Sequence, residues 1–156
     1  MVRVRRPSAG RHHPASAADV RRALEAFGAE FYYGVTMVEL VPAPALSTRL
    51  PLGRLLAGGR IVLYDQAPSP WRLGFTLPPS ERERLSVAGA KLSAPGVVVW
   101  PGQTLRRFML GYVLAHELGH HVLQHERRLR GERGARTREH EARAEILAAR
   151  LRARLR

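Results

Sequence analysis

No cysteine occurs among the 156 residues of the chain. Its absence excludes disulfide bonds, a catalytic thiol and zinc sites with thiolate ligands, so any metal ion would need His, Asp or Glu ligands. Long apolar runs are also missing, since no stretch approaches the roughly 20 residues that span a bilayer. The basic N-terminus is not followed by the apolar segment of a secretory signal. We therefore expect a soluble, cytoplasmic protein with no membrane partner.

Lysine is almost as rare, because every one of the 26 basic residues except Lys91 is arginine. Against 13 acidic residues this gives a formal net charge of +13, which suits a nucleic-acid partner because basic side chains neutralise phosphates. The replacement of lysine by arginine, with abundant Ala, Gly and Pro, also fits the codon bias of a GC-rich genome. The charge therefore leaves nucleic-acid binding through an arginine-rich surface as an alternative function.

The length and a hydrophobic content of 45% fit one globular domain. Residues 1–15 are basic and contain no acidic residue, so we expect a flexible tail there and a single domain over residues 16–156. A helix is expected over residues 17–27, because Ser16 and Asp19 form a capping pattern and Gly28 is a natural stop.

Three stretches rich in apolar, aromatic or β-branched residues predict strands: 31–41, 60–65 and 96–100. Residues 66–80 contain four prolines and predict a loop, whereas residues 80–92 are ambiguous between helix and coil. Two long helices are expected over residues 105–125 and 138–155, the second capped by Thr137, with a charged loop between them at 126–136. This order of elements predicts an α+β fold with a small twisted sheet backed by helices.

The motif His-Glu-Leu-Gly-His, of the HExxH type, occupies residues 116–120 within the apolar stretch YVLAHELGHHVL. Helical residues four apart differ by only about 40° in direction, so His116 and His120 can bind one metal ion. Glu117 then lies beside that ion. A bound zinc ion lowers the pKa of a coordinated water, and Glu117 takes its proton as general base and returns it to the leaving amine.

The same pentapeptide also occurs by chance, as an exposed helical turn with two ordinary histidines. Its apolar flanks favour the metal site here, since buried polar side chains must find partners. Metzincin spacing would need a histidine where the sequence has Glu126, so that class is excluded. His121 and His125 point to other sides of the helix and are expected to be surface or capping residues.

Glu141, 21 residues after His120, is the best candidate for the third ligand, because the second helix can fold back beside the first. Two histidines and a glutamate are the ligand set of the gluzincin class. Glu145, one turn further on the same face, can accept a hydrogen bond from the second ring nitrogen of a ligand histidine. The alternative for both glutamates is a solvated face on which they pair with arginines.

Residues 107–151 contain the segments RFMLGYVLAHELGHHVLQH and REHEARAEILAARL, which resemble the ImmA/IrrE metallopeptidases. In that family a helix reading HE-(I/L)-GHH-(L/V)-L is followed by one reading E-x-x-A-(N/D)-x-F-A-x-x-L. Five residues fall on the second pattern: Glu141, Ala144, Leu147, Ala148 and Leu151. Glu145 stands where Asn or Asp is usual in the family, and Leu147 where Phe is usual.

The resemblance implies that His116, His120 and Glu141 are ligands of zinc, with manganese as the alternative, and that Glu117 is the catalytic base. It further implies a zincin-like fold with an HExxH helix and a C-terminal helix that carries Glu141. Its implied substrate is a helix-turn-helix transcriptional repressor, whose cleavage would derepress stress, phage or mobile-element genes.

We therefore expect residues 16–156 to form a metallopeptidase-like domain, a zinc-dependent endopeptidase that hydrolyses a peptide bond in a specific protein. One alternative is a DNA-associated protein, since residues 126–156 contain 11 arginines against 5 glutamates. The other is a non-catalytic zincin-like module that acts by binding a partner. Steeply salt-dependent binding to DNA would support the nucleic-acid hypothesis. Loss of cleavage in a Glu117→Gln variant that keeps its metal would support the endopeptidase.

Zincins bind substrate as an extended strand at the edge of a sheet above the metal helix. The apolar segment 96–100, directly before that helix, is our candidate for this sheet, with an ordinary core strand as the alternative. A donor to the developing oxyanion is also expected near the metal. Tyr112, His140 and Arg143 are candidates that the sequence does not distinguish, and Tyr112 also suits a packing role.

Overall fold

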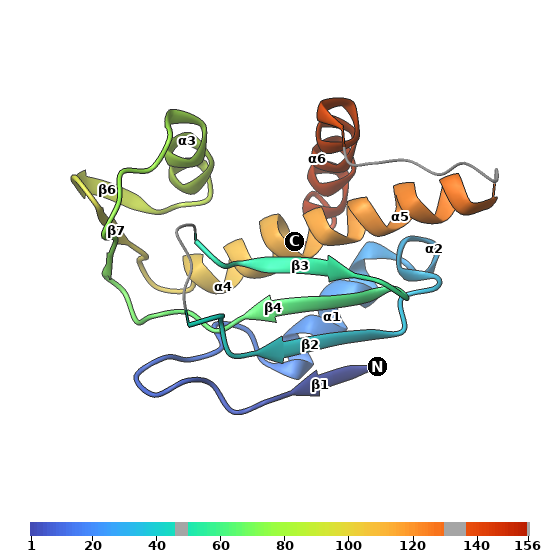
Figure 1. The fold of residues 1–156 in the computed structure, drawn as a ribbon, viewed down its shortest axis with the longest axis horizontal. Helices are drawn as coiled ribbons and strands as arrows, with labels where there is room; N and C mark the ends of the chain where they lie inside the picture. The colour runs from blue at the N-terminus through green and yellow to red at the C-terminus, as the bar shows by residue number, and fades with distance from the viewer. Residues whose placement is uncertain (46–49, 130–136, 156) are drawn as a thin grey trace.

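The computed structural model describes residues 1–45, 50–129 and 137–155, and Figure 1 shows an α+β arrangement of a small sheet with helices against it. The four-stranded sheet has the order β1 (Val2–Val4), β2 (Met37–Val41), β4 (Arg60–Tyr64) and β3 (Gly53–Leu56). Neighbouring strands run parallel except for β3, which pairs with β4 in antiparallel register. The mixed α+β class expected from the sequence is confirmed.

A second, three-stranded sheet has the order β5 (Trp71–Arg72), β7 (Val97–Val99) and β6 (Lys91–Ala94). The helices are α1 (Ala17–Phe27), α2 (Ala29–Tyr32), α3 (Pro79–Val87), α4 (Thr104–Phe108), α5 (Ala115–Leu129) and α6 (Arg138–Arg152). A π-helical segment, η1 (Met109–Leu114), joins α4 to α5. No helix among the described residues combines the length and apolar character that crossing a membrane requires.

One hydrophobic core links both sheets to the helices. Its largest fully buried members come from α1, β4, α3, the α4–α5 segment and α6, and include Phe27, Ile61, Leu63, Leu85, Phe108, Leu114, Leu118 and Leu151. The α4–α5 segment runs along the β3 edge of the four-stranded sheet, and α6 packs across α5 (Figure 1). The core thus holds α5 between the sheet edge and α6, which is where the HExxH motif lies.

The helix predicted over residues 17–27 is confirmed as α1, with Ser16 and Asp19 in a reciprocal capping box. The strand predicted over residues 60–65 is confirmed as β4. The prediction of a strand from residue 31 is wrong for its first half, because residues up to Tyr32 form α2 and Gly34, at φ 81°, turns the chain before β2. Extended backbone thus begins only at Met37.

The loop predicted over residues 66–80 contains the two-residue strand β5. The segment 80–92, whose sequence is ambiguous between helix and coil, contains most of α3 and the start of β6. The helix predicted over residues 105–125 is present but longer, since α5 continues to Leu129 into the expected loop. Residues 130–136 of that loop prediction lie outside the described residues. The last helix, predicted over 138–155, is present as α6 with Thr137 as its N-cap, but it ends earlier, at Arg152.

The prediction of a flexible tail over residues 1–15 is wrong. Val2–Val4 form β1 against β2, and the chain after β1 is fixed by a carboxylate far away in sequence. Buried Asp65 accepts hydrogen bonds from the Ser8 backbone N–H at 2.7 Å, the Ala43 backbone N–H at 3.0 Å and Arg11 Nε at 2.7 Å. The segment contains no acid of its own, so its partners could not be found by inspecting it alone.

The Asp65 carboxylate is expected to stabilise the fold by about 2 kcal/mol at neutral pH. Burial disfavours its charged form, but the hydrogen bonds from Ser8, Ala43 and Arg11 outweigh burial and lower the pKa from 3.8 to about 2. Because the folded-state pKa lies below the ordinary value, this contribution is complete above pH 3.8 and is lost as the pH falls toward 2. Urea unfolding of Asp65→Asn should show the loss at neutral pH and a smaller difference in acid. Exposed Glu83→Gln is the control, and an equal loss at both pH values would contradict the prediction.

Candidate metal centre

A single residue, Ala115, separates the end of the π-helical segment η1 at Leu114 from the start of the HExxH motif at His116. A π segment inside a longer helix changes which side chains face the core and is frequent at functional sites. Here it precedes α5, in which His120 is almost fully buried and His116 is 19% exposed. The two imidazoles therefore lie at the boundary between the core and solvent.

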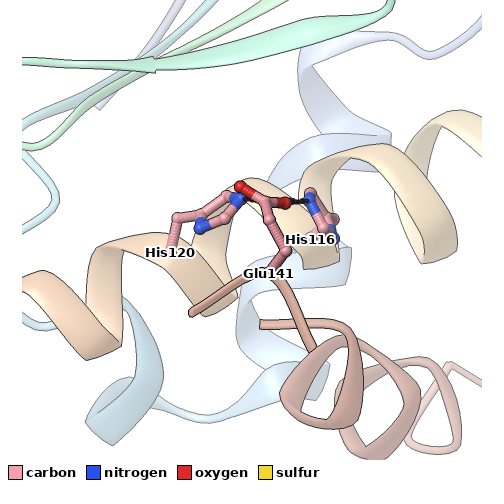
Figure 2. Close-up of side chains that lie close together, drawn as sticks. All are labelled: His116, His120 and Glu141. Atoms are coloured by element: carbon pink, nitrogen blue, oxygen red, sulfur yellow. Dashed lines mark hydrogen bonds and ion pairs between the residues drawn. The ribbon is translucent and has the colours of Figure 1, made fainter. Parts of the chain in front are cut away.

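Figure 2 shows the side chains of His116 and His120 on α5 and of Glu141 on α6 pointing toward one another. The two histidine Nε2 atoms are 3.0 Å apart. Glu141 Oε2 lies 3.4 Å from His116 Nε2 and 3.3 Å from His120 Nε2. Within the described ranges, these three residues form the one group of His and acidic side chains close enough to share a metal ion.

Close packing of α6 on α5 brings Glu141 to the histidines. A Cβ atom on Gly119 would lie 2.6 Å from the backbone oxygen of Ala144 and 3.2 Å from its Cα. Only glycine at position 119 permits that approach without a shift of backbone. Thr137 fixes the start of α6 by accepting a hydrogen bond from the His140 N–H, which places Glu141 in its first turn. Gly119 of the motif thus allows α6 to pack closely on α5.

Glu145 lies on the far side of the His116 ring from the cluster. Its Oε2 is 3.2 Å from His116 Nδ1. The hydrogen bond with His116 lowers the pKa of Glu145 despite its partial burial, and Arg84 and Arg152 act in the same direction. An ionised carboxylate only accepts hydrogen bonds, so Nδ1 carries the proton and the Nε2 lone pair points to the cluster. This tautomer is the one that a metal ligand needs, so the residues present fit a metal ion.

Loss of the Glu145 carboxylate is expected to weaken zinc binding by about 10–100-fold, because His116 loses the acceptor that fixes its tautomer and ring orientation. The measurement is zinc affinity by competition with a chromophoric chelator, for Glu145→Ala beside the wild type. Glu145→Gln keeps an acceptor oxygen and should recover part of the affinity. Equal affinity of the alanine variant and the wild type would refute a positioning role for Glu145.

Glu117 is buried against the edge strand β3. Glu117 Oε2 accepts a hydrogen bond from the Leu55 backbone N–H at 2.8 Å, and Glu117 as a whole is 8% exposed. The sequence patterns above predict no strand at 53–56, so they do not reveal this neighbour of Glu117. A signal was available, because Gly58 and Gly59 separate two apolar stretches and both adopt positive φ, as tight hairpin turns require.

The sheet whose edge lies beside α5 is therefore the four-stranded sheet, and not the sheet that contains the predicted segment 96–100. The segment 96–100 contains β7, which is the central strand of the three-stranded sheet and offers no free edge. The edge next to α5 belongs to β3, whose Leu55 contacts Glu117. This short apolar run is the central strand, with β5 on one edge and β6 on the other, so it is not the edge strand considered from the sequence.

A cavity of about 690 Å³ adjoins the candidate metal centre. His116 and Glu117 form part of its wall. Apolar side chains form much of the rest: Leu50, Leu52, Phe75, Leu77 and Val113. Glu81 and Arg84 of α3 also line it and lie 3.7 Å apart as an ion pair. The site thus opens into a space large enough for amino-acid side chains of a bound chain.

Two other histidines on α5 lie away from the cluster, although His121 is not the surface residue expected. It is 7% exposed, its Nε2 donates to the Tyr33 carbonyl at 2.9 Å, and burial lowers its pKa. His125 packs edge-on against the Tyr33 ring. Together they attach α5 to the turn after α2, which is a structural role.

The three candidate oxyanion donors lie in different surroundings. The buried His140 ring stacks on His120 with ring centres 5.1 Å apart. The guanidinium of Arg152 covers the Tyr112 ring at 3.8 Å, which fits the packing role considered for that tyrosine. Arg143 lies 3.9 Å from Glu126 in an exposed ion pair. His140 is thus the candidate in direct contact with a cluster residue.

Comparisons of the chain with protein-family models, with curated proteins and with solved structures give no match in any of the three. The assignment of function therefore depends on the geometry of the site and on the motifs in the sequence.

Proposed function

We propose that this protein is a zinc-dependent endopeptidase of the gluzincin type with a zincin-like fold. The observation that carries the proposal is the convergence of His116 Nε2, His120 Nε2 and Glu141 Oε2 within 3.4 Å of one another. Two imidazole nitrogens and one carboxylate oxygen are a ligand set of catalytic zinc, and manganese is the alternative. Glu117, the residue after the first ligand, lines the same cavity as His116.

A metal ion in this site supplies Lewis acidity, which polarises a peptide carbonyl and makes a water molecule a stronger nucleophile at neutral pH. Glu117 takes a proton from the attacking water and delivers it to the amine nitrogen that leaves when the C–N bond breaks. The Leu55 N–H holds one oxygen of Glu117, so the carboxylate has a fixed orientation before substrate arrives. Glu145 holds the His116 ring in the tautomer that leaves Nε2 as a ligand.

The substrate binds along β3 in this proposal. The Leu55 N–H of this edge strand is already donated to Glu117, so an extended peptide adds to the edge at Gly53, which lines the cavity beside Glu117. The adjoining cavity, with Leu52, Leu77 and Val113 in its wall, suits an apolar side chain of that peptide. The resemblance of the two helices to ImmA/IrrE metallopeptidases makes a helix-turn-helix repressor our proposed protein substrate.

The proposal is tested by incubating the zinc-loaded protein with a complex library of peptides and identifying new termini by mass spectrometry. Cleavage by the wild type and none by Glu117→Gln is the expected result. A library covers many sequences, so it detects a peptidase of narrow specificity that a single generic substrate would miss. Stoichiometric zinc without cleavage of any peptide would instead favour the non-catalytic interaction module.

A further inference from the structure

A second cavity, of about 710 Å³, lies between α1, the helical segment from Thr104 to Tyr112 and the end of α6. It shares no lining residue with the cavity at the candidate metal centre. Among the described residues that line it, five are arginines and one is acidic: Arg22, Arg106, Arg107, Arg152, Arg154 and Asp19. A cavity with this excess of guanidinium groups attracts an anion.

The acidic groups near these five arginines are too few to neutralise them. Arg152 pairs with Glu145 at 3.6 Å and Arg154 with Glu30 at 3.2 Å, which leaves Asp19 for the other three. Asp19 is shared, because it caps α1 while Arg22 lies 2.5 Å and Arg106 3.5 Å from its Oδ1. The hydrogen bond from the Ser16 backbone, helped by the Ser16 hydroxyl and the two arginines, lowers the pKa of Asp19 despite its burial. Its single negative charge therefore faces two positive ones. Arg107, next to Arg106 on α4, is exposed at the cavity.

The remaining wall is largely apolar: Ala23, Ala26, Val87, Ala88, Leu110 and Leu155. A ligand that fills this cavity therefore gains from an apolar body as well as from negative charge. Guanidinium groups bind phosphate through paired hydrogen bonds and also stack on flat rings. A phosphate attached to a heterocyclic body combines both features, and the cavity volume lies in the range of small-molecule sites.

We propose that this cavity binds an organic phosphate of nucleotide size, with its phosphate held by Arg106 and Arg107. The apolar body of the ligand lies against the alanine and leucine side chains of the wall. Arg152 also lines this cavity, but it lies 3.6 Å from Glu145, so changing it would disturb the metal centre as well. Arg106 and Arg107 have no such contact with the candidate ligands, and they are the residues to test.

The experiment measures binding of AMP and ATP by titration calorimetry to Arg106→Gln/Arg107→Gln beside the wild type. The control is Arg21→Gln/Arg82→Gln, which removes the same charge from two exposed positions outside the cavity lining. We expect one nucleotide per chain and a loss of affinity of about tenfold or more in the cavity variant, against less than about threefold in the control. His116→Ala should bind nucleotide like the wild type, so the result does not depend on the peptidase proposal.

Two further probes separate the sources of phosphate. Inorganic phosphate should bind at least about tenfold more weakly than the nucleotides, since it has no apolar body to bury. Equal affinity for inorganic phosphate would overturn the assignment to an organic ligand. The other probe is a single-stranded oligonucleotide. If its binding depends steeply on salt and weakens equally in both double variants, the ligand binds the general basic surface, and the proposal of a specific site in this cavity is overturned. Absence of nucleotide binding to a folded wild type would do the same.

Discussion

Replacing Glu117 with glutamine is expected to reduce peptide hydrolysis by about 10²–10⁴-fold while zinc remains bound. The amide oxygen of glutamine can still accept the hydrogen bond from the Leu55 N–H, so the side chain keeps its place against β3. The amide cannot take a proton from water, so the proton-transfer step loses its base. The variant therefore removes the general base and keeps the side chain in its place against β3.

The measurement pairs cleavage rates on the most sensitive library peptide with the zinc content of both proteins. Glu126→Gln, an exposed change on the same helix, is the matched control and should retain both zinc and activity. If Glu117→Gln hydrolysed peptides at the wild-type rate, Glu117 would not be the base. If it lost its zinc instead, the carboxylate would have a role in holding the site together, and the proposed division of roles would be wrong.

The local parts of this site could be predicted from the sequence because helix geometry fixes them. Residues four apart on a helix share a face, so the pairing of His116 with His120 follows from spacing alone. The same rule places Glu141 and Glu145 on one face of α6, and the structure brings the first to both histidines and the second to His116 Nδ1. The distance between helices was not predictable in this way, since it depends on Gly119 meeting the Ala144 backbone.

The contacts that join distant segments could not be predicted from local patterns. Leu55 and Glu117 are far apart in sequence, and only the placement of β3 at the sheet edge brings them together. The N-terminal segment has the sequence of a tail, because its partner, Asp65, follows β2, β3 and β4 along the chain. The π segment before α5 also changes the phase of the helix, which an ideal period of 3.6 residues does not anticipate.

Glu141→Ala is expected to reduce zinc from near one ion per chain in the wild type to below about a tenth of an ion per chain after dialysis. Glu141 supplies the one oxygen ligand atom of the cluster and is its one member on α6. Without it, two imidazoles remain, and a tetrahedral site with an open position lacks its third protein ligand. The residue is about half exposed, so its removal leaves no cavity in the core and the variant should fold.

Elemental analysis of the purified proteins measures this effect, with far-ultraviolet circular dichroism to verify folding. Glu139→Ala is the matched control, because it removes a carboxylate from the same first turn of α6, at an exposed position outside the cluster. It should keep its zinc, which separates loss of a ligand from loss of a favourable charge at the helix N-terminus. A wild type that binds no zinc even after addition of the metal would contradict the site itself. HExxH would then be an ordinary helical turn, and the arginine-lined cavity would become the stronger indication of function.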